Sequence, residues 1–143
     1  GAYNSRNRLR TLRDRRDFRR GWGAFCIIAP LVVEDKTMHC ISIQISPKHA
    51  REFDRRALLD RVRSIRSPEV DAIEEKGKLF LSFNFFTEYP AQLWQELQQA
   101  LYLDQIYAPQ IAPVSIVICE GETEDDCLLL HHFNRDEPLD SFT

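Results

Sequence analysis

Residues 74–86 read EEKGKLFLSFNFF and carry the clearest strand pattern in the chain. Leucine or phenylalanine occupies every second position from 79 to 85, which is the period of a β-strand with one face in a hydrophobic core. Glycine readily adopts the backbone conformation of a tight turn, so the preceding Lys76-Gly77 pair predicts a reversal of the chain. Residues 69–86 are therefore predicted to form a β-hairpin whose alternating leucines and phenylalanines face inward.

An amphipathic helix is predicted on each side of this hairpin. The upstream helix starts at Ser46-Pro47, a favourable N-cap followed by a first-turn proline, and ends at Ser67-Pro68. The downstream helix begins near Pro90. Both have apolar residues at the helical period, as expected of helices that pack on a sheet. The residues predicted to face inward are Phe53, Ala57, Leu58, Val62 and Ile65 in the first helix, and Leu93, Trp94, Leu97, Ala100 and Leu101 in the second.

Four more segments have the composition of β-strands, namely residues 24–33, 38–46, 114–120 and 127–133. From residue 38 onward the predicted order of elements is β-α-β-β-α-β, which resembles the split βαβ pattern of ferredoxin-like folds. We therefore predict an α+β protein with two helices on one face of a mainly antiparallel sheet. This ferredoxin-like sandwich would carry an extra N-terminal strand and a C-terminal strand.

The length and composition predict one globular domain with charged ends. The chain has 143 residues, 43% hydrophobic and 29% charged, which suffices for a core without metals or disulfides. No apolar run approaches the ~18 residues that span a bilayer, and no secretory signal is visible, so we expect a cytoplasmic protein without membrane contact. The predicted parts are a basic arm or short helix over 1–22, a single α+β domain over 23–133 and an acidic, frayed tail over 134–143.

The charges are concentrated at opposite ends of the chain, although the formal net charge is only −3. Residues 1–20 contain eight arginines and two aspartates, whereas residues 120–143 contain eight acidic residues and one arginine. Such asymmetry is typical of an arm that binds nucleic acid or an acidic partner. It is equally typical of two ends that neutralise each other within one chain or between subunits.

The cysteines and histidines do not form a recognisable metal site. The four cysteines lie in apolar, strand-like segments without C-x-x-C spacing, so we predict buried, reduced thiols that behave as small hydrophobic side chains. Adjacent His131 and His132 would point to opposite faces of a strand and would not bind one ion together. We predict no metal and no cofactor. The cysteines are Cys26, Cys40, Cys119 and Cys127.

The second strand of the hairpin also resembles part of the longer signature of the RNA-recognition motif, a family with a ferredoxin-like fold. The matching residues are Lys76, Gly77, Phe80, Leu81 and Phe83. Lys78 stands where the first stacking aromatic belongs, and Leu79 replaces a small residue. The resemblance implies that Phe80 stacks on a base from the face opposite the helices, unless residues 24–33 or the N-terminal segment cover that face. The interpretation that we favour is an ordinary hairpin strand with a phenylalanine-rich core face.

The sequence carries no diagnostic catalytic motif. Both the G-x-S-x-G nucleophile elbow and a glycine-rich phosphate loop are missing. We therefore expect a non-catalytic protein-binding or regulatory domain, of the inhibitor or immunity type, that binds another protein or a second copy of itself. Its contact surfaces would be the charged ends or an unpaired outer strand that adds to another sheet. The candidate partner-binding residues are Arg13, Arg15, Arg16, Arg19, Arg20, Trp22, Glu122, Glu124, Asp125 and Asp126.

The alternative is a nucleic-acid-binding domain. In this hypothesis, arginines of the N-terminal arm and of the first helix neutralise phosphates, for which the planar guanidinium group is well suited. The hairpin would contribute side chains from its open face. The candidate nucleic-acid-binding residues are Arg8, Arg10, Arg55, Arg56, Lys76, Lys78, Phe80 and Asn84.

Overall fold

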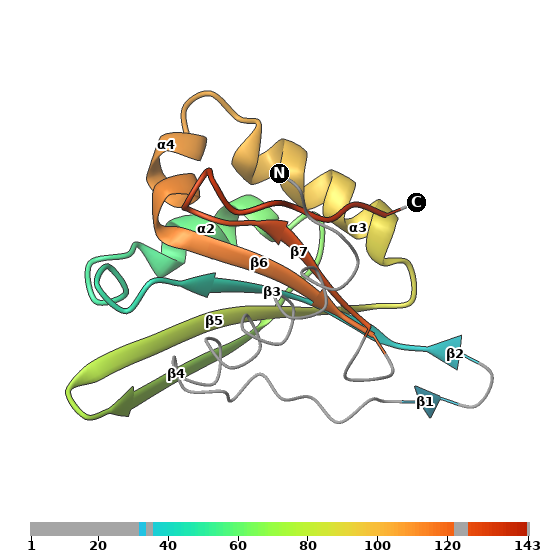
Figure 1. The fold of residues 1–143 in the computed structure, drawn as a ribbon, viewed down its shortest axis with the longest axis horizontal. Helices are drawn as coiled ribbons and strands as arrows, with labels where there is room; N and C mark the ends of the chain where they lie inside the picture. The colour runs from blue at the N-terminus through green and yellow to red at the C-terminus, as the bar shows by residue number, and fades with distance from the viewer. Residues whose placement is uncertain (1–31, 34–35, 122–125, 143) are drawn as a thin grey trace.

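The computed structural model describes residues 32–33, 36–121 and 126–142, which form an antiparallel sheet with helices on one of its faces (Figure 1). The sheet has five strands in the order β4-β5-β3-β6-β7, and every neighbouring pair is antiparallel. The predicted α+β class is therefore confirmed. The order differs from a four-stranded unit because β7 joins the same sheet beside β6. The strands are β3 His39–Ile45, β4 Glu69–Glu75, β5 Lys78–Thr87, β6 Ser115–Glu120 and β7 Cys127–His131.

Two short strands lie outside this sheet. Val32–Val33 (β1) and Lys36–Thr37 (β2) pair with each other in a separate antiparallel ribbon. The remainder of the strand predicted over 24–33 lies outside the described residues, as does the arm predicted over 1–22.

The predicted hairpin is confirmed as β4 and β5. Glu75 pairs with Lys78, and only Lys76 and Gly77 lie between the two strands. Both have positive φ, 53° for Lys76 and 79° for Gly77. Two consecutive residues in the left-handed backbone conformation form the tight turn that is favoured in two-residue hairpins, because its twist matches that of the flanking strands. Glycine adopts this conformation at the second position without strain.

The upstream helix begins later than the sequence predicted. The structure places α2 at Arg55–Val62, with Asp54 as its N-cap, because the Asp54 carboxylate accepts a hydrogen bond from the Ala57 amide at 3.1 Å. Ser46 is buried, and its amide donates to the Val114 carbonyl at 2.7 Å. The proposed start at Ser46-Pro47 is therefore wrong, because the Ser46 backbone continues the contact between the ends of β3 and β6 instead of opening a helix.

The downstream helix starts where it was predicted. The helix α3 spans Pro90–Leu97 and continues as a π-helical turn, η1, over Gln98–Tyr102. A short helix, α4 (Ala108–Ile111), and a 3-10 turn, η2 (Ala112–Val114), then lead into β6. None of the helices in the described part of the chain is long and apolar enough to cross a membrane.

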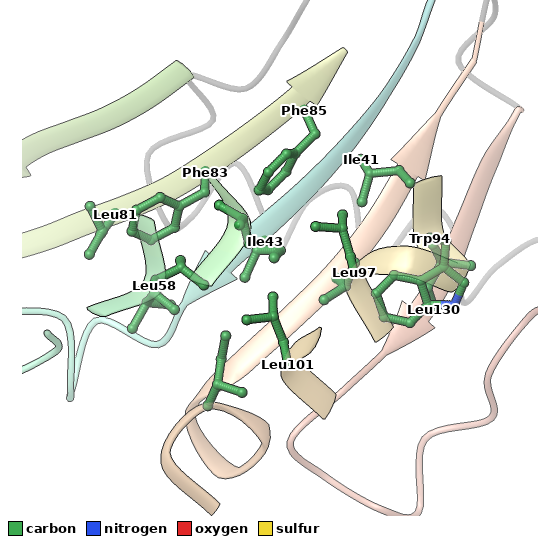
Figure 2. Close-up of a cluster of buried hydrophobic side chains, with 14 of the residues drawn as sticks. Ile41, Ile43, Leu58, Leu81, Phe83, Phe85, Trp94, Leu97, Leu101 and Leu130 are labelled. Carbon is green, nitrogen blue, oxygen red and sulfur yellow. The ribbon is translucent and has the colours of Figure 1, made fainter. Parts of the chain in front are cut away.

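The main hydrophobic core lies between the sheet and the helices (Figure 2). Phe83 of β5, Ile43 of β3 and Val117 of β6 lie side by side in the register and have no exposed surface. Leu58 of α2 and Leu97 of α3 cover this row from the helical side and are also fully buried. The alternation in residues 79–85 therefore has the predicted orientation.

The opposite face of the sheet is also buried. It carries a second hydrophobic cluster, and beside it a row of polar side chains on β3 and β5, each at most 4% exposed. Within that row the Asn84 amide donates to the Asp71 carboxylate of β4 at 2.9 Å. The cluster residues are Phe80, Ile116, Ile118, Cys127 and Leu129, and the polar residues are Ser42, Gln44, Ser82 and Asn84.

Candidate functional site

The two outer strands of the sheet are β4 and β7, and they differ in what covers them. In the described part of the chain, β4 pairs with β5 on one side and has no strand on the other. Six of its seven residues are exposed. An outer strand of this kind presents a row of backbone amides and carbonyls to which another extended chain can bond.

The β4 edge is strongly acidic. Four of its seven residues are carboxylates, namely Glu69, Asp71, Glu74 and Glu75. Val70 and Ile73 lie among them with 38% and 37% of their surface exposed. The edge therefore combines backbone hydrogen-bonding groups, negative charge and two accessible apolar side chains.

The register assigns these side chains to two faces. Val70, Ala72 and Glu74 lie opposite core-facing residues of β5, whereas Asp71 and Ile73 lie opposite Ser82 and Phe80 on the other face. Because both faces of the edge carry negative charge and an apolar side chain, a strand added beside β4 would contact both kinds of group on each of its own faces.

One basic residue already pairs with this edge. The Arg51 guanidinium contacts both carboxylate oxygens of Glu74, at 3.1 and 3.4 Å. This hydrogen-bonded ion pair lowers the pKa of Glu74 and raises the pKa of Arg51. Both side chains are more than half exposed to solvent, so the pair contributes little to stability. It shows that a guanidinium group fits the carboxylates of this strand.

The β7 edge is covered by the end of the same chain. The Asp140 amide donates to the Leu129 carbonyl, and the Leu129 amide donates to the Asp140 carboxylate, both at 2.7 Å. Asp140 is only 7% exposed. The prediction that residues 134–143 are frayed is therefore wrong for this part of the tail, because Asp140 satisfies the backbone amide and carbonyl of Leu129 in the middle of β7.

The described residues among those proposed for nucleic-acid binding do not all lie at the surface. Arg55 and Arg56 are exposed in the first turn of α2, and Lys76 and Lys78 are exposed at the hairpin turn. In contrast, Phe80 and Asn84 are buried, with 4% and 2% of their surface exposed. A base can stack only on an exposed ring face, so the buried ring of Phe80 supports the hydrophobic cluster in this structure. Arg8 and Arg10 lie outside the described residues.

Most of the predicted partner-binding residues lie outside the described part of the chain. Asp126 is exposed, and its carbonyl accepts a hydrogen bond from the Gly121 amide at 2.8 Å, which closes the turn between β6 and β7. A Cβ atom at Gly121 would require the exposed Asp126 side chain to move. The others lie outside the described residues: Arg13, Arg15, Arg16, Arg19, Arg20, Trp22, Glu122, Glu124 and Asp125.

The described cysteines and His131 lie on β3, β6 and β7 and not on the β4 edge. Cys40, Cys119 and Cys127 are buried, as predicted, and burial raises the pKa of the Cys119 thiol to about 12. Cys26 lies outside the described residues. The His131 imidazole contacts the Ala112 carbonyl at 2.9 Å, and burial lowers its pKa. In the described ranges, no three potential metal-ligating residues come together.

Sequence reasoning named an outer strand as a possible contact surface but did not select β4. The available signal was the composition of residues 69–75, four of which are carboxylates. That composition is typical of an edge strand, where charged residues prevent uncontrolled pairing.

Comparison with known proteins adds no further assignment, since no family model, curated protein or solved structure matches the chain.

Proposed function

We propose that this chain is a non-catalytic protein-binding domain that accepts an extended, basic segment of another protein along the β4 edge. The observation that carries the proposal is the difference between the two outer strands. The β4 edge is exposed and unpaired within the described residues, whereas the β7 edge is covered by Asp140. By sequestering the segment that it binds, such a domain would act as a regulator or inhibitor of its partner.

The chemistry of the edge selects the partner. Strand addition obtains affinity from main-chain hydrogen bonds and specificity from alternating side chains. Lysine or arginine side chains of the partner would face Glu69, Glu74 and Glu75, and small apolar side chains would contact Val70 and Ile73. The contact between Arg51 and Glu74 is an example of such a pair within the chain.

The same charges disfavour two other occupants of this edge. Nucleic acid would place phosphates beside four carboxylates. A second copy that pairs with β4 in antiparallel fashion about Ala72 would place Glu69 opposite Glu75, and like charges directly opposite are destabilising. A basic segment of a different protein avoids both penalties.

A finer assignment of the fold accompanies this proposal, namely that β3 to β6 correspond to a ferredoxin-like unit extended at one edge by β7. The support is that β3 lies between β5 and β6 and is antiparallel to both, as a split βαβ unit requires. The extension has a functional consequence because β7 covers the β6 edge of that unit. Within the described residues, β4 is then the outer strand of the unit that has no neighbour on its outer side.

The direct test is fluorescence anisotropy with labelled seven-residue peptides, the length of β4. A peptide of alternating lysine and valine should bind, and salt should weaken the binding. A peptide of alternating glutamate and valine should not bind. Amide chemical shifts in a titration should change most along residues 69–75.

Charge reversal on the edge supplies the matched variants. The double variant Glu69→Lys with Glu75→Lys should weaken binding of the lysine-valine peptide about tenfold, since each exposed ion pair contributes under about 1 kcal/mol. The control, Glu96→Lys with Asp136→Lys, makes the same change of net charge at exposed positions of α3 and of the tail that covers β7, and should bind like the wild type. Equal loss in both variants, or shift changes confined to α2, would contradict the proposal. So would preferential binding of a labelled RNA of similar length.

A further inference from the structure

The turn between η1 and α4 exposes two large apolar side chains. Leu103 is 62% exposed and Ile106 is 81% exposed, which makes Ile106 the most exposed large hydrophobic residue in the described part of the chain. This turn protrudes from the helical layer, on the side away from β4 (Figure 1). We refer to residues 103–106 as the tip.

The tip is held rigidly. The Asp104 carboxylate accepts hydrogen bonds from the amides of Ile106 and Tyr107, at 3.2 and 2.8 Å, and pairs with Arg61 of α2 at 3.1 Å. The Leu103 amide donates to the Gln98 carbonyl at 2.8 Å, which closes the π-helical turn. An apolar side chain on a fixed turn loses little conformational entropy on binding, which is the property of an interface anchor.

Arg61 connects this turn to the rest of the domain. Its Nε donates to the Ala100 carbonyl at 3.1 Å, and its guanidinium carbon lies 4.7 Å from the centre of the Tyr107 ring. Tyr107 is buried, and that burial raises its pKa to about 12. Arg61 is therefore a positioning residue that fixes both ends of the tip against α2.

The segment that carries the tip has few charged side chains. In residues 89–115 these are Glu96 and Asp104. Asp104 pairs with Arg61 of α2, and Asp60 of that helix pairs with Arg63 at its C-terminal end. A shallow hollow of about 590 Å³ lies beside the two apolar side chains, lined by Gln99, Leu103, Asp104, Gln105 and Ile106. Exposed apolar side chains with few charged neighbours are typical of the core of a protein interface.

We infer that the tip mediates self-association of the chain, with Ile106 of one copy lying in the hollow of a second copy related by a two-fold axis. A two-fold interface places one surface against itself, so a strongly charged surface repels its own copy and a neutral one does not. The protruding Ile106 side chain and the hollow also lie on the same surface, as a self-complementary contact requires. This inference goes beyond the proposed binding of a basic segment and uses a different part of the molecule.

The experiment is sedimentation velocity on the whole chain over a range of micromolar concentrations. The wild type should show a concentration-dependent dimer. Ile106→Glu should raise the dimer dissociation constant by about tenfold or more, because it removes the anchor and places like charges across the axis. The control, Gln92→Glu, adds the same charge on an exposed position of α3 outside the hollow and should dimerise like the wild type.

A second variant tests the role of Arg61. Arg61→Lys keeps the charge beside Asp104 but loses the planar group that reaches Ala100 and Tyr107, so it should weaken the dimer less than Ile106→Glu does. A wild type that stays monomeric at all concentrations would overturn the inference. So would a dimer that survives Ile106→Glu, or one that Gln92→Glu disrupts equally. The variant Glu69→Lys with Glu75→Lys should leave the dimer intact, which separates this result from the peptide-binding test.

Discussion

The strands β4 and β7 occupy equivalent outer positions in one sheet, yet they differ in exposure and in what covers their outer side. The β7 strand is largely buried, and Asp140 bonds to the backbone of Leu129 on its outer side. The β4 strand is exposed, acidic and without a neighbour on its outer side in the described residues. We propose that this difference separates two roles, in which the covered edge serves the stability of the fold and the charged edge is the one that binds a partner.

The largest expected difference between the two strands is in the free energy of unfolding that is lost when an apolar side chain is truncated. Leu129→Ala on β7 should lower the free energy of unfolding by about 2–5 kcal/mol, because Leu129 is fully buried and its truncation leaves a cavity. Ile73→Ala on β4 should cost about 1 kcal/mol or less, because Ile73 is partly exposed. Urea unfolding of both variants measures the difference. Equal losses would mean that β4 is as much a part of the core as β7.

The next effect concerns the cover of β7. Asp140→Ala should lower the free energy of unfolding by about 1–3 kcal/mol, because the buried Leu129 amide would lose its acceptor. Asp140→Asn keeps one acceptor oxygen and should lose less. Asp136→Ala, at an exposed position of the same tail, is the control and should behave like the wild type. A neutral Asp140→Ala variant would show that the tail does not secure this edge.

The β7 side should also respond to pH near neutrality. Burial lowers the pKa of His131, so as the pH falls the unfolded chain takes up this proton before the folded chain does. The stabilisation is thus complete above the ordinary histidine pKa of about 6.5 and is lost as the pH falls below that value. The urea midpoint should therefore decrease from about pH 7.5 to about pH 5.5, and His131→Gln should reduce that slope. An unchanged slope in His131→Gln would refute this explanation.

The smallest expected effect is a change in the free energy of unfolding at the turn between β4 and β5. Lys76 has a φ of 53°, a conformation that asparagine adopts more easily than lysine. Lys76→Asn should therefore raise the free energy of unfolding by about 0.5 kcal/mol without changing peptide binding at β4. Lys78→Asn, within the strand, should give no such gain. A destabilised Lys76→Asn variant would mean that the lysine side chain itself contributes to the turn.

Local patterns in the sequence predicted much of the fold. The alternation in residues 79–85 and the Lys76-Gly77 pair predicted the hairpin, and the helical spacing after Pro90 predicted the buried positions Leu93, Trp94 and Leu97. The start of the upstream helix was missed because Ser46-Pro47 and Asp54 both resemble N-caps. Only the contact of Ser46 with Val114, distant in sequence, decides between them.

The candidate site was predicted less completely than the fold. The sequence indicated that an outer strand could bind a partner, but which strand is outer and uncovered depends on pairings between distant residues. The alternation of β5 also placed Phe80 on the face opposite the helices, and it could not predict that this ring would be buried with Ile116 and Leu129.

The sequence by itself determined the elements that depend on neighbours along the chain, because periodicity and turn-forming residues act over a few positions. These elements are the hairpin, the core face of β5, the α3 helix and the acidic character of β4. The tertiary structure alone decided that Asp140 covers β7, that no described strand pairs with the outer side of β4 and that Arg61 fixes the exposed tip. Each of these depends on the folded chain bringing together residues far apart in sequence.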